Sequence, residues 1–265
     1  MKGLSRLQDQ PIKKAVRLGD VVLGEGMVKI CVPVMGGTIE EIACAAAQAA
    51  QAKADLIELR IDSLSPMPEQ GEAIAACRAA KKAAGRPVLF TMRTARDGGP
   101  GSKDTEAYEA LLTAVAQARA CEAIDCELSV GEAAFMRIVQ AAHAADVKVV
   151  GSSHEFGEIG DMQRAAQWLR RQEALGADVC KAAVMTRSST QVLEAALAMA
   201  RAGEAIACPM IAIAMGPAGV LTRIGGACMG SCLSFGTAGK ASAPGQIDAI
   251  ALRGMLETIH AAMGM

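Results

Sequence analysis

Lys181 is a charged residue in an apolar stretch of the sequence, where a lysine is unusual. It lies in the segment 178–185, DVCKAAVM, whose apolar residues are typical of a buried β-strand. Burial disfavours the charged form of an amine, and a neutral amine is a nucleophile that condenses with ketones and aldehydes to give a Schiff base. A lysine at a strand end can also extend to water or pair with a carboxylate, so the strand alone leaves both interpretations open.

Further polar residues occur where other apolar runs end. Glu58, Arg60 and Asp62 follow a period of two, which places their side chains on one side of a strand. The remaining candidates are Arg93, Asp97, His154, Glu155, Met215, Arg223, Ser242 and Gln246. With Lys181 they supply an amine, an imidazole, arginines and carboxylates. Such a set suits proton transfer beside a carbonyl held as an iminium, and the arginines indicate an anionic, oxygen-rich substrate.

Most of these residues also have an ordinary structural interpretation. Glu58 and Arg60 could form an internal salt bridge, and Asp62 could support an arginine or cap a turn. His154 could be a hydrogen-bonded loop histidine, and Arg223 could pair with a carboxylate on its own face. The functional interpretation therefore depends on a fold that brings all of these side chains to one place.

Composition narrows the classes of function. The chain has 265 residues, a formal net charge of −1, and only one Trp, one Tyr and four Phe. This composition argues against a nucleic-acid binder, which normally has a basic face and stacking aromatic residues. Its nine cysteines form no Cys-x-x-Cys pair, and Cys228 and Cys232 match no strong zinc spacing, so we expect no metal site. The cysteines are scattered within apolar runs, as expected for a protein of the reducing cytoplasm. No apolar stretch is long enough to span a membrane, so we expect a soluble protein without membrane partners.

Apolar strand-like runs alternate with alanine-rich helical stretches from residue 28 onwards. The expected strands are 28–34, 55–60, 88–92, 123–127, 148–152, 178–184, 210–215 and 231–235. The expected helices are 39–51, 69–84, 105–120, 132–145, 161–175, 190–202, a short one after Pro217, and 246–263. Eight such units predict an α/β fold, a (β/α)8 TIM barrel, with active-site groups at the carboxyl ends of the strands. An open doubly wound sheet is the runner-up, but the glycine-rich turn that it needs after its first strand is missing.

Local signals refine this architecture. Thr38 and Ser189 occupy plausible N-cap positions, and Gly85, Gly176 and Gly203 follow helical runs as C-cap glycines do. Residues 16–23, with the GEG turn at 24–26, indicate a strand and turn that could close the amino-terminal end of the barrel. We therefore expect residues 1–265 to form a single barrel domain, with 1–27 as an N-terminal extension that caps it.

Several motifs occur in a fixed order along these strands. They are GEG at 24–26, ELRID at 58–62, TMRT at 91–94, SHEF at 153–156, Lys181, Met215 with Gly219 and Arg223, and ASAPGQ at 241–246. With them the chain resembles the type I 3-dehydroquinate dehydratases, Schiff-base hydro-lyases of the shikimate pathway, over nearly its whole length. The resemblance implies an enzyme that needs no cofactor, acts on a small molecule in aromatic amino acid biosynthesis or in quinate breakdown, and forms a homodimer.

The resemblance also implies a role for each candidate. Lys181 would condense with the C3 ketone of 3-dehydroquinate, and His154 would remove a C2 proton and then protonate the leaving C1 hydroxyl in a syn elimination. Arg223 would bind the substrate carboxylate, and Met215 would pack against the ring. Other substrate contacts would come from Glu58, Arg60, Arg93, Ser242 and Gln246, with Asp97, Glu155 and Asp62 in supporting positions.

The chain departs from the family pattern at two positions. Asp97 stands where the family often has a glutamate near the histidine, so its side chain is one methylene shorter. Pro33 stands where the first strand often ends in a serine. Neither change removes a catalytic group, but the first leaves the positioning of His154 open.

Two other functions remain possible at this point. A Schiff-base aldolase on the same barrel would share Lys181, although it would favour phosphate-binding loops after the last two strands, where this chain reads SAPGQ at 242–246. A barrel that only binds a metabolite would give Lys181 and His154 no joint purpose.

The glycines of segment 236–246 predict a mobile lid over the barrel mouth, with Ser242 and Gln246 closing on the substrate.

Overall fold

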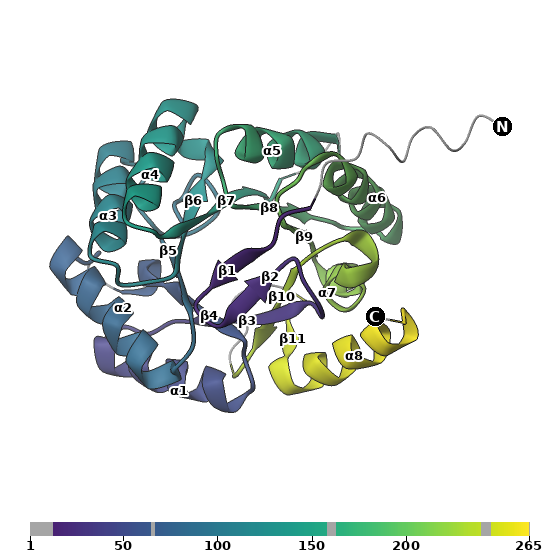
Figure 1. The fold of residues 1–265 in the computed structure, drawn as a ribbon, viewed down its shortest axis with the longest axis horizontal. Coiled ribbons are helices and arrows are strands. Elements are labelled where there is room, and N and C mark those ends of the chain that lie inside the picture. Colours follow the sequence, from purple (N-terminus) through teal and green to yellow (C-terminus); the bar gives the residue numbers. More distant parts are fainter. Residues whose placement is uncertain (1–12, 65–66, 158–162, 240–244, 265) are drawn as a thin grey trace.

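The computed structural model describes residues 13–64, 67–157, 163–239 and 245–264 (Figure 1). Within these residues, parallel strands form one curled sheet in the order β11-β10-β3-β4-β5-β6-β7-β8-β9. Their bounds are β3 (Lys29–Val34), β4 (Leu56–Arg60), β5 (Val88–Thr91), β6 (Ala123–Glu127), β7 (Lys148–Glu155), β8 (Val179–Met185), β9 (Met210–Met215), β10 (Leu233–Thr237) and β11 (Ile247–Asp248). A bridge between Met210 and Ser231 joins β9 to the start of the β10 segment. The predicted TIM-barrel architecture is confirmed.

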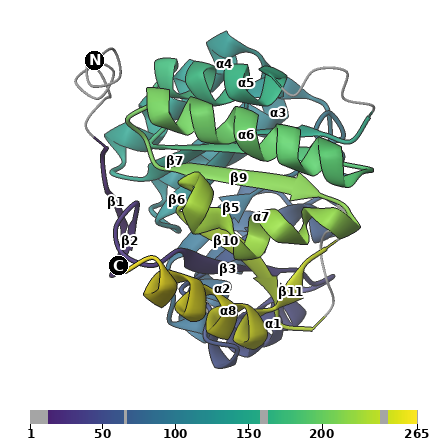
Figure 2. The same cartoon turned by 90° about the vertical axis from the view of Figure 1, so that its right-hand side faces the viewer.

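Helices surround the strands, as Figure 1 shows from one end of the barrel and Figure 2 from the side. Their bounds are α1 (Ile39–Gln51), α2 (Gln70–Ala84), α3 (Thr105–Gln117), α4 (Glu132–Ala144), α5 (Gln163–Ala174), α6 (Ser189–Ala205), α7 (Val220–Ile224) and α8 (Ala249–Ala262). Short 3₁₀ helices occupy Ile61–Ser63, Leu128–Val130, Pro217–Gly219 and Gly226–Met229. Asp62 therefore lies in a turn beyond β4 rather than on the strand itself.

Some of the predicted helix ends need correction. Thr38 caps α1 as expected, and Gly85 ends α2 in the left-handed conformation. The N-cap of α6 is Ser188 rather than Ser189, because the Ser188 hydroxyl accepts from the Gln191 N–H. Gly203 lies inside α6, where a side chain would come within 2.7 Å of Met210, so this glycine permits close packing and does not end the helix.

The last predicted helix begins later than expected. Segment 246–248 first forms the short strand β11, in which Ile247 pairs with Gly236 of β10. Asp248 then caps α8 by accepting from the N–H groups of Ile250 and Ala251. A short side chain that can accept two orphan N–H groups fixes the start of a helix more strongly than the apolar pattern around it.

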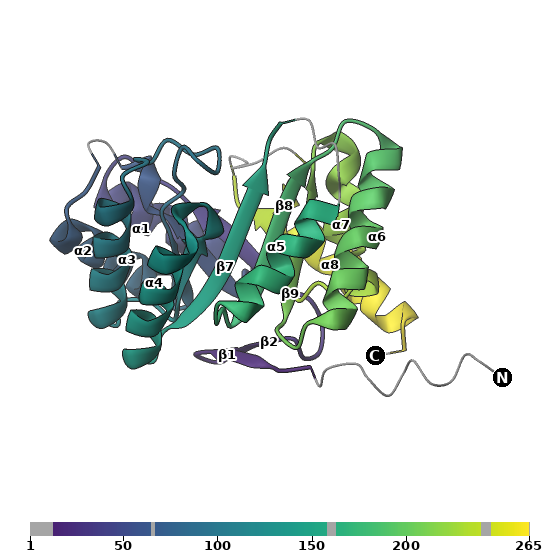
Figure 3. The same cartoon turned by 90° about the horizontal axis from the view of Figure 1, so that it is seen from above.

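A β-hairpin closes one end of the barrel. Strands β1 (Val16–Leu18) and β2 (Val21–Leu23) pair antiparallel and lie across the centre of the ring in Figure 1. Figure 3 places this hairpin at the end from which the barrel strands start. Leu18 and Leu23 are each 1 % exposed, because they pack on apolar side chains of the barrel interior. The predicted cap is confirmed, and it leaves the carboxyl ends of the strands open.

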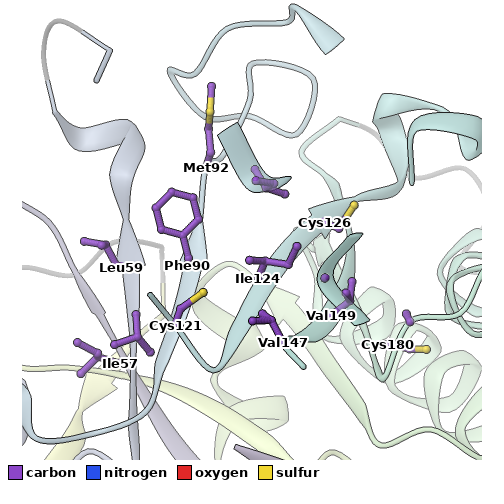
Figure 4. Close-up of a cluster of buried hydrophobic side chains, with 14 of the residues drawn as sticks. Ile57, Leu59, Phe90, Met92, Cys121, Ile124, Cys126, Val147, Val149 and Cys180 are labelled. Carbon is purple, nitrogen blue, oxygen red and sulfur yellow. The ribbon is translucent and has the colours of Figure 1, made fainter. Parts of the chain in front are cut away.

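Side chains on the strands divide between two cores. The outward-facing residues pack under the helices, and Figure 4 shows Ile57, Leu59, Phe90, Ile124, Cys126 and Val149 among them. The inward-facing residues near the amino ends of the strands form the second core: Leu56, Leu89, Ala123, Val150, Val179 and Ile211. Two residues further along, the same inward face carries Glu58, Thr91, Asp125, Ser152 and Lys181, all buried. The barrel interior thus changes from apolar to ionisable towards its carboxyl end.

In the part of the chain that the structure describes, no helix combines the length and apolarity that crossing a membrane requires.

Candidate active site

A pocket opens at the carboxyl ends of the strands, opposite the hairpin. Its lining comprises Glu58, Arg60, Arg93, Gly98, His154, Phe156, Lys181, Ala183, Ile213, Met215, Arg223, Phe235 and Gln246. The structure therefore gathers most of the residues that the sequence singled out. Asp62, Asp97 and Glu155 lie behind or beside this lining, while Ser242 and residues 240–244 of the predicted lid fall outside the described residues.

Lys181 reaches this pocket from the middle of β8 and is 3 % exposed. Its Nζ lies 3.2 Å from Asp125 Oδ2 and 3.6 Å from Glu58 Oε1. The ring of Phe235 lies on another side, with its centroid 4.8 Å from Nζ. The amine is thus held between two buried carboxylates and an aromatic face, so its position in the pocket is well defined.

Asp125 connects the amine to a buried arginine. Its carboxylate lies 3.0 Å from Arg93 Nη2 and accepts from the Ser152 hydroxyl at 2.5 Å. Burial alone would raise the pKa of the Asp125 carboxyl, but the charges of Arg93 and Lys181 outweigh it and hold that pKa well below its usual range. Asp125 is therefore an anion that keeps both cations in place.

Arg93 is engaged mainly by groups of the barrel itself. Its Nη1 donates to Glu127 at 2.8 Å and to Ser152 at 3.2 Å, in addition to the pairing with Asp125. Glu127 also accepts from the N–H and the hydroxyl of Thr94. Arg93 is therefore a buried cation that the barrel anchors at the edge of the pocket.

His154 lies on β7, next to the strand that carries Lys181, with its side chain 9 % exposed. Asp97 Oδ2 accepts from the His154 backbone N–H at 3.1 Å and lies 3.0 Å from Nδ1. Burial, helped by the nearby charges of Arg93 and Lys181, lowers the pKa of His154 to about 3, against the opposing effect of Asp97. The imidazole is therefore neutral near pH 7, and contact with Asp97 at Nδ1 leaves Nε2 as the proton acceptor.

The shorter carboxylate at position 97 still reaches the histidine because its loop folds tightly. Gly98 has φ +78°, and a side chain there would come within 2.2 Å of the Phe156 ring, which stacks on His154 at a centroid distance of 6.4 Å. A side chain on Gly99 would meet the Arg93 carbonyl at 2.2 Å. The two glycines thus let the loop bring Asp97 against β7, which answers the question that the sequence left open.

The other two predicted arginines differ in their settings. Arg60 forms a two-pronged ion pair with Asp62, with Nε to Oδ1 at 3.0 Å and Nη2 to Oδ2 at 2.7 Å. Asp62 also accepts from the Arg93 N–H, so it links the two loops behind the pocket. Arg223 is buried at the end of α7, and burial lowers the pKa of its guanidinium to about 10, which keeps it cationic near neutrality.

Glu155 does not join this cluster. Its carboxylate accepts from the Gly157 N–H and lies 3.4 Å from Arg164 Nη1, at the rim of the barrel. Within the described residues, Glu155 therefore contacts the segment that follows β7 and the start of α5.

Sequence reasoning missed two of the buried carboxylates and two aromatic residues of the site. Asp125 and Glu127 are ionisable residues in the expected strand 123–127, and the argument that drew attention to Lys181 applies to them equally. Phe235 carries no signal of its own, because an aromatic residue at a strand end is ordinarily a core residue, and Phe156 entered the sequence analysis only as the last letter of the SHEF motif. Only the fold places them beside the amine and the imidazole.

Among the residues that the structure describes, no three His, Cys, Asp or Glu side chains are grouped closely enough to hold an ion. The carboxylates of the pocket are instead paired with Lys181 and Arg93.

Comparison with known proteins places this arrangement in a family. The family model for type I 3-dehydroquinase matches residues 30–263. The chain is 39 % identical over 249 residues to a 3-dehydroquinate dehydratase of Klebsiella pneumoniae, covering 92 % of this chain and 98 % of that protein. It is 36 % identical over 242 residues to a protein of the same name from Listeria welshimeri, covering 91 % and 96 % respectively.

Solved structures agree with this assignment. A type I 3-dehydroquinate dehydratase from Clostridium difficile, determined with covalent modified comenic acid, superposes with a TM-score of 0.90 at 31 % identity, covering 95 % of this chain and all of that one. A 3-dehydroquinate dehydratase from Geobacillus kaustophilus gives a TM-score of 0.90 at 30 % identity, covering 95 % and 98 %. The chain therefore belongs to the type I 3-dehydroquinase family of hydro-lyases, as its motifs predicted.

Proposed function

We propose that this protein dehydrates 3-dehydroquinate to 3-dehydroshikimate in the shikimate pathway, through a Schiff base on Lys181. The Lys181 ammonium first gives up a proton, the free amine adds to the C3 ketone, and a proton returns as water leaves, which gives an iminium. His154 removes a proton from C2, and the C1 hydroxyl then departs as water with a proton returned by His154. Hydrolysis of the iminium releases the product and restores the amine.

The setting of Lys181 carries this proposal. Its amine lies in a buried pocket, 3.2 Å from Asp125 and 3.6 Å from Glu58. Two carboxylates beside one nitrogen stabilise the positive charge of an iminium, which keeps that group electron-withdrawing while the adjacent C–H bond breaks. The solved relative from Clostridium difficile is described with covalent modified comenic acid, so a member of the family is known with a covalently modified ligand.

The charges around His154 suit a base that works beside an iminium. The positive charge at Lys181 helps to depress the pKa of His154, so the free imidazole starts in its proton-accepting form. When the C2 proton is removed, electron density enters the iminium and cancels that positive charge. The imidazolium that forms is then no longer repelled by a positive charge at Lys181, and it remains in contact with the Asp97 carboxylate.

The remaining lining residues account for substrate binding. Arg223 is a buried cation suited to the substrate carboxylate, and Met215 offers an apolar surface to the ring. Glu58, Arg60 and Gln246 supply acceptors and donors for ring hydroxyls, and we extend this role to Ser242. Arg93 contributes mainly charge, since Asp125, Glu127 and Ser152 already occupy its donors.

Turnover of purified protein tests the proposal directly. The wild type should convert 3-dehydroquinate into a product with the ultraviolet absorbance of a conjugated enone, and Lys181→Ala should not. Lys148→Ala is a matched control. Lys148 is the first residue of β7, at the end of the barrel away from the pocket, so it should be dispensable for turnover. An inactive wild type, or a Lys181→Ala variant that still converts the substrate, would overturn the proposed function.

A further inference from the structure

Gln172 is a buried polar side chain that the proposed chemistry does not use. It lies on α5, outside the barrel, and is 0 % exposed. The inner half of a helix that covers a sheet normally carries apolar residues, and the neighbouring buried positions of α5 are Ala165, Ala166 and Leu169. A glutamine in this layer has to find partners for all of its polar atoms.

The Gln172 carboxamide finds those partners on the backbone of Lys181. Its Oε1 accepts from the Lys181 N–H at 2.9 Å, and its Nε2 donates to the Lys181 carbonyl at 3.0 Å. Nε2 also donates to the Ser153 hydroxyl at 3.1 Å. The Gln172 side chain therefore hydrogen-bonds to the N–H and the carbonyl of Lys181 and to the hydroxyl of Ser153, the residue before His154.

The backbone of β7 approaches the Gln172 side chain closely. Gly151 of β7 faces its side chain, and a Cβ at position 151 would lie 3.0 Å from Gln172 Cβ and Cγ and 3.0 Å from Ala177 Cβ. The absence of a side chain at Gly151 is thus what allows the carboxamide to reach β8. Helix α5, strand β7 and strand β8 meet at this point.

We infer that Gln172 is a positioning residue for the Schiff-base lysine, holding the backbone of Lys181 and, through Ser153, the strand of His154 in a fixed mutual register. The inference rests on the proposed function. Lys181 and His154 project from neighbouring strands, with Ser152 opposite Lys181 in the sheet, so their separation depends on how β7 and β8 lie against each other. A displacement of the order of 1 Å in such a pair can cost about a hundredfold in rate.

Gln172→Met tests this role, since methionine has a similar length and packs well but cannot hydrogen-bond to either backbone group. We expect kcat to fall by about tenfold or more while KM stays within about threefold, because the pocket lining is unchanged and only the reacting groups shift. Trapping of the substrate adduct with borohydride should slow in parallel. Gln48→Met, at an exposed glutamine of α1, is the matched control and should behave as wild type.

A second variant tests the same contact without removing the carboxamide. Gly151→Ala places a methyl group 3.0 Å from Gln172 Cβ and Cγ, so the Gln172 side chain must shift by a few tenths of an ångström and kcat should fall, even if Gln172→Met does not fold. If either variant is folded at the assay temperature and turns over like wild type, Gln172 is only a packing residue and the inference is wrong. An inactive wild type would instead remove the proposed function and the inference with it, so the two failures are distinguishable.

Discussion

At the scale of single residues, the site is a set of mutually compensated charges. Lys181 contacts Asp125 and Glu58, and Arg93 contacts Asp125 and Glu127, so each of these buried cations has buried anions beside it. Removing one partner of such a pair costs about 3–5 kcal/mol, because the other charge stays buried without compensation. Buried ionisable groups of this kind gather where they serve chemistry.

His154 provides the clearest test at this scale. His154→Ala removes the proposed base but leaves the amine and its carboxylate partners in place. We expect the turnover rate to fall by roughly 10²–10⁴, while borohydride still traps an adduct with the substrate. Near-normal turnover in a steady-state assay would mean that another group removes the proton.

The titration of His154 gives a second prediction. Its pKa of about 3 in the folded protein lies far below the unfolded value of about 6.5. A histidine of this kind contributes stability that is fully present above the unfolded value and is lost as the pH falls through the window between about 6.5 and about 3. NMR of the labelled imidazoles, with His154→Ala to assign the signal, should show this ring neutral at pH values where an ordinary histidine has become charged. A midpoint at the ordinary value would contradict the burial and charge effects described above.

At the scale of elements, loops rather than strands determine the details of the site. The strand pattern predicted where Lys181 and His154 lie, because an alternation of apolar runs and helices fixes which strand ends meet. It could not predict that Asp97 reaches His154, since that contact depends on a loop conformation with Gly98 at φ +78°. It also could not predict the contact between Gln172 and Lys181, which joins a helix to a strand across the outer core.

Gly98→Ala should therefore damage both stability and turnover. The new methyl group would meet the Phe156 ring and force a non-glycine residue into a left-handed conformation, a strain of about 1–3 kcal/mol. The midpoint temperature of thermal unfolding and kcat should both fall. Gly254→Ala is the control: it lies on the exposed side of α8 with open space around it, and should stabilise the helix by about 0.5–1 kcal/mol. Equal behaviour of the two variants would refute this account of the loop.

At the scale of the whole molecule, the barrel separates stability from chemistry along its axis. The β1–β2 hairpin covers the amino-terminal end of the barrel (Figure 3). The interior next to it is apolar, whereas the carboxyl-terminal half of the interior carries the ionisable groups. The sequence predicted both halves, since residues 16–23 read as a strand and turn and the polar residues followed the strands. Association into a homodimer stays a prediction, which light scattering of the purified protein would decide.

The hairpin should matter for stability and little for turnover. Leu18→Ala would open a cavity between the hairpin and the barrel, and should lower the free energy of unfolding by about 2–5 kcal/mol. The KM of the remaining folded protein should be unchanged, because the pocket lies at the other end. Met136→Ala, at a half-exposed position of α4, should change the stability by less than about 0.5 kcal/mol. A large rise in KM for Leu18→Ala would show that the two ends are coupled.

The central claim, a Schiff base on Lys181, is tested most directly by reduction of the adduct. Purified protein incubated with 3-dehydroquinate and sodium borohydride should gain the mass of one reduced adduct per chain, and peptide mapping should place it on Lys181. Lys181→Ala should gain none, and Lys181→Arg should not restore it, because a guanidinium keeps its proton and forms no imine. An adduct on another lysine, or turnover of 3-dehydroquinate by the wild type without any reducible adduct, would contradict the account.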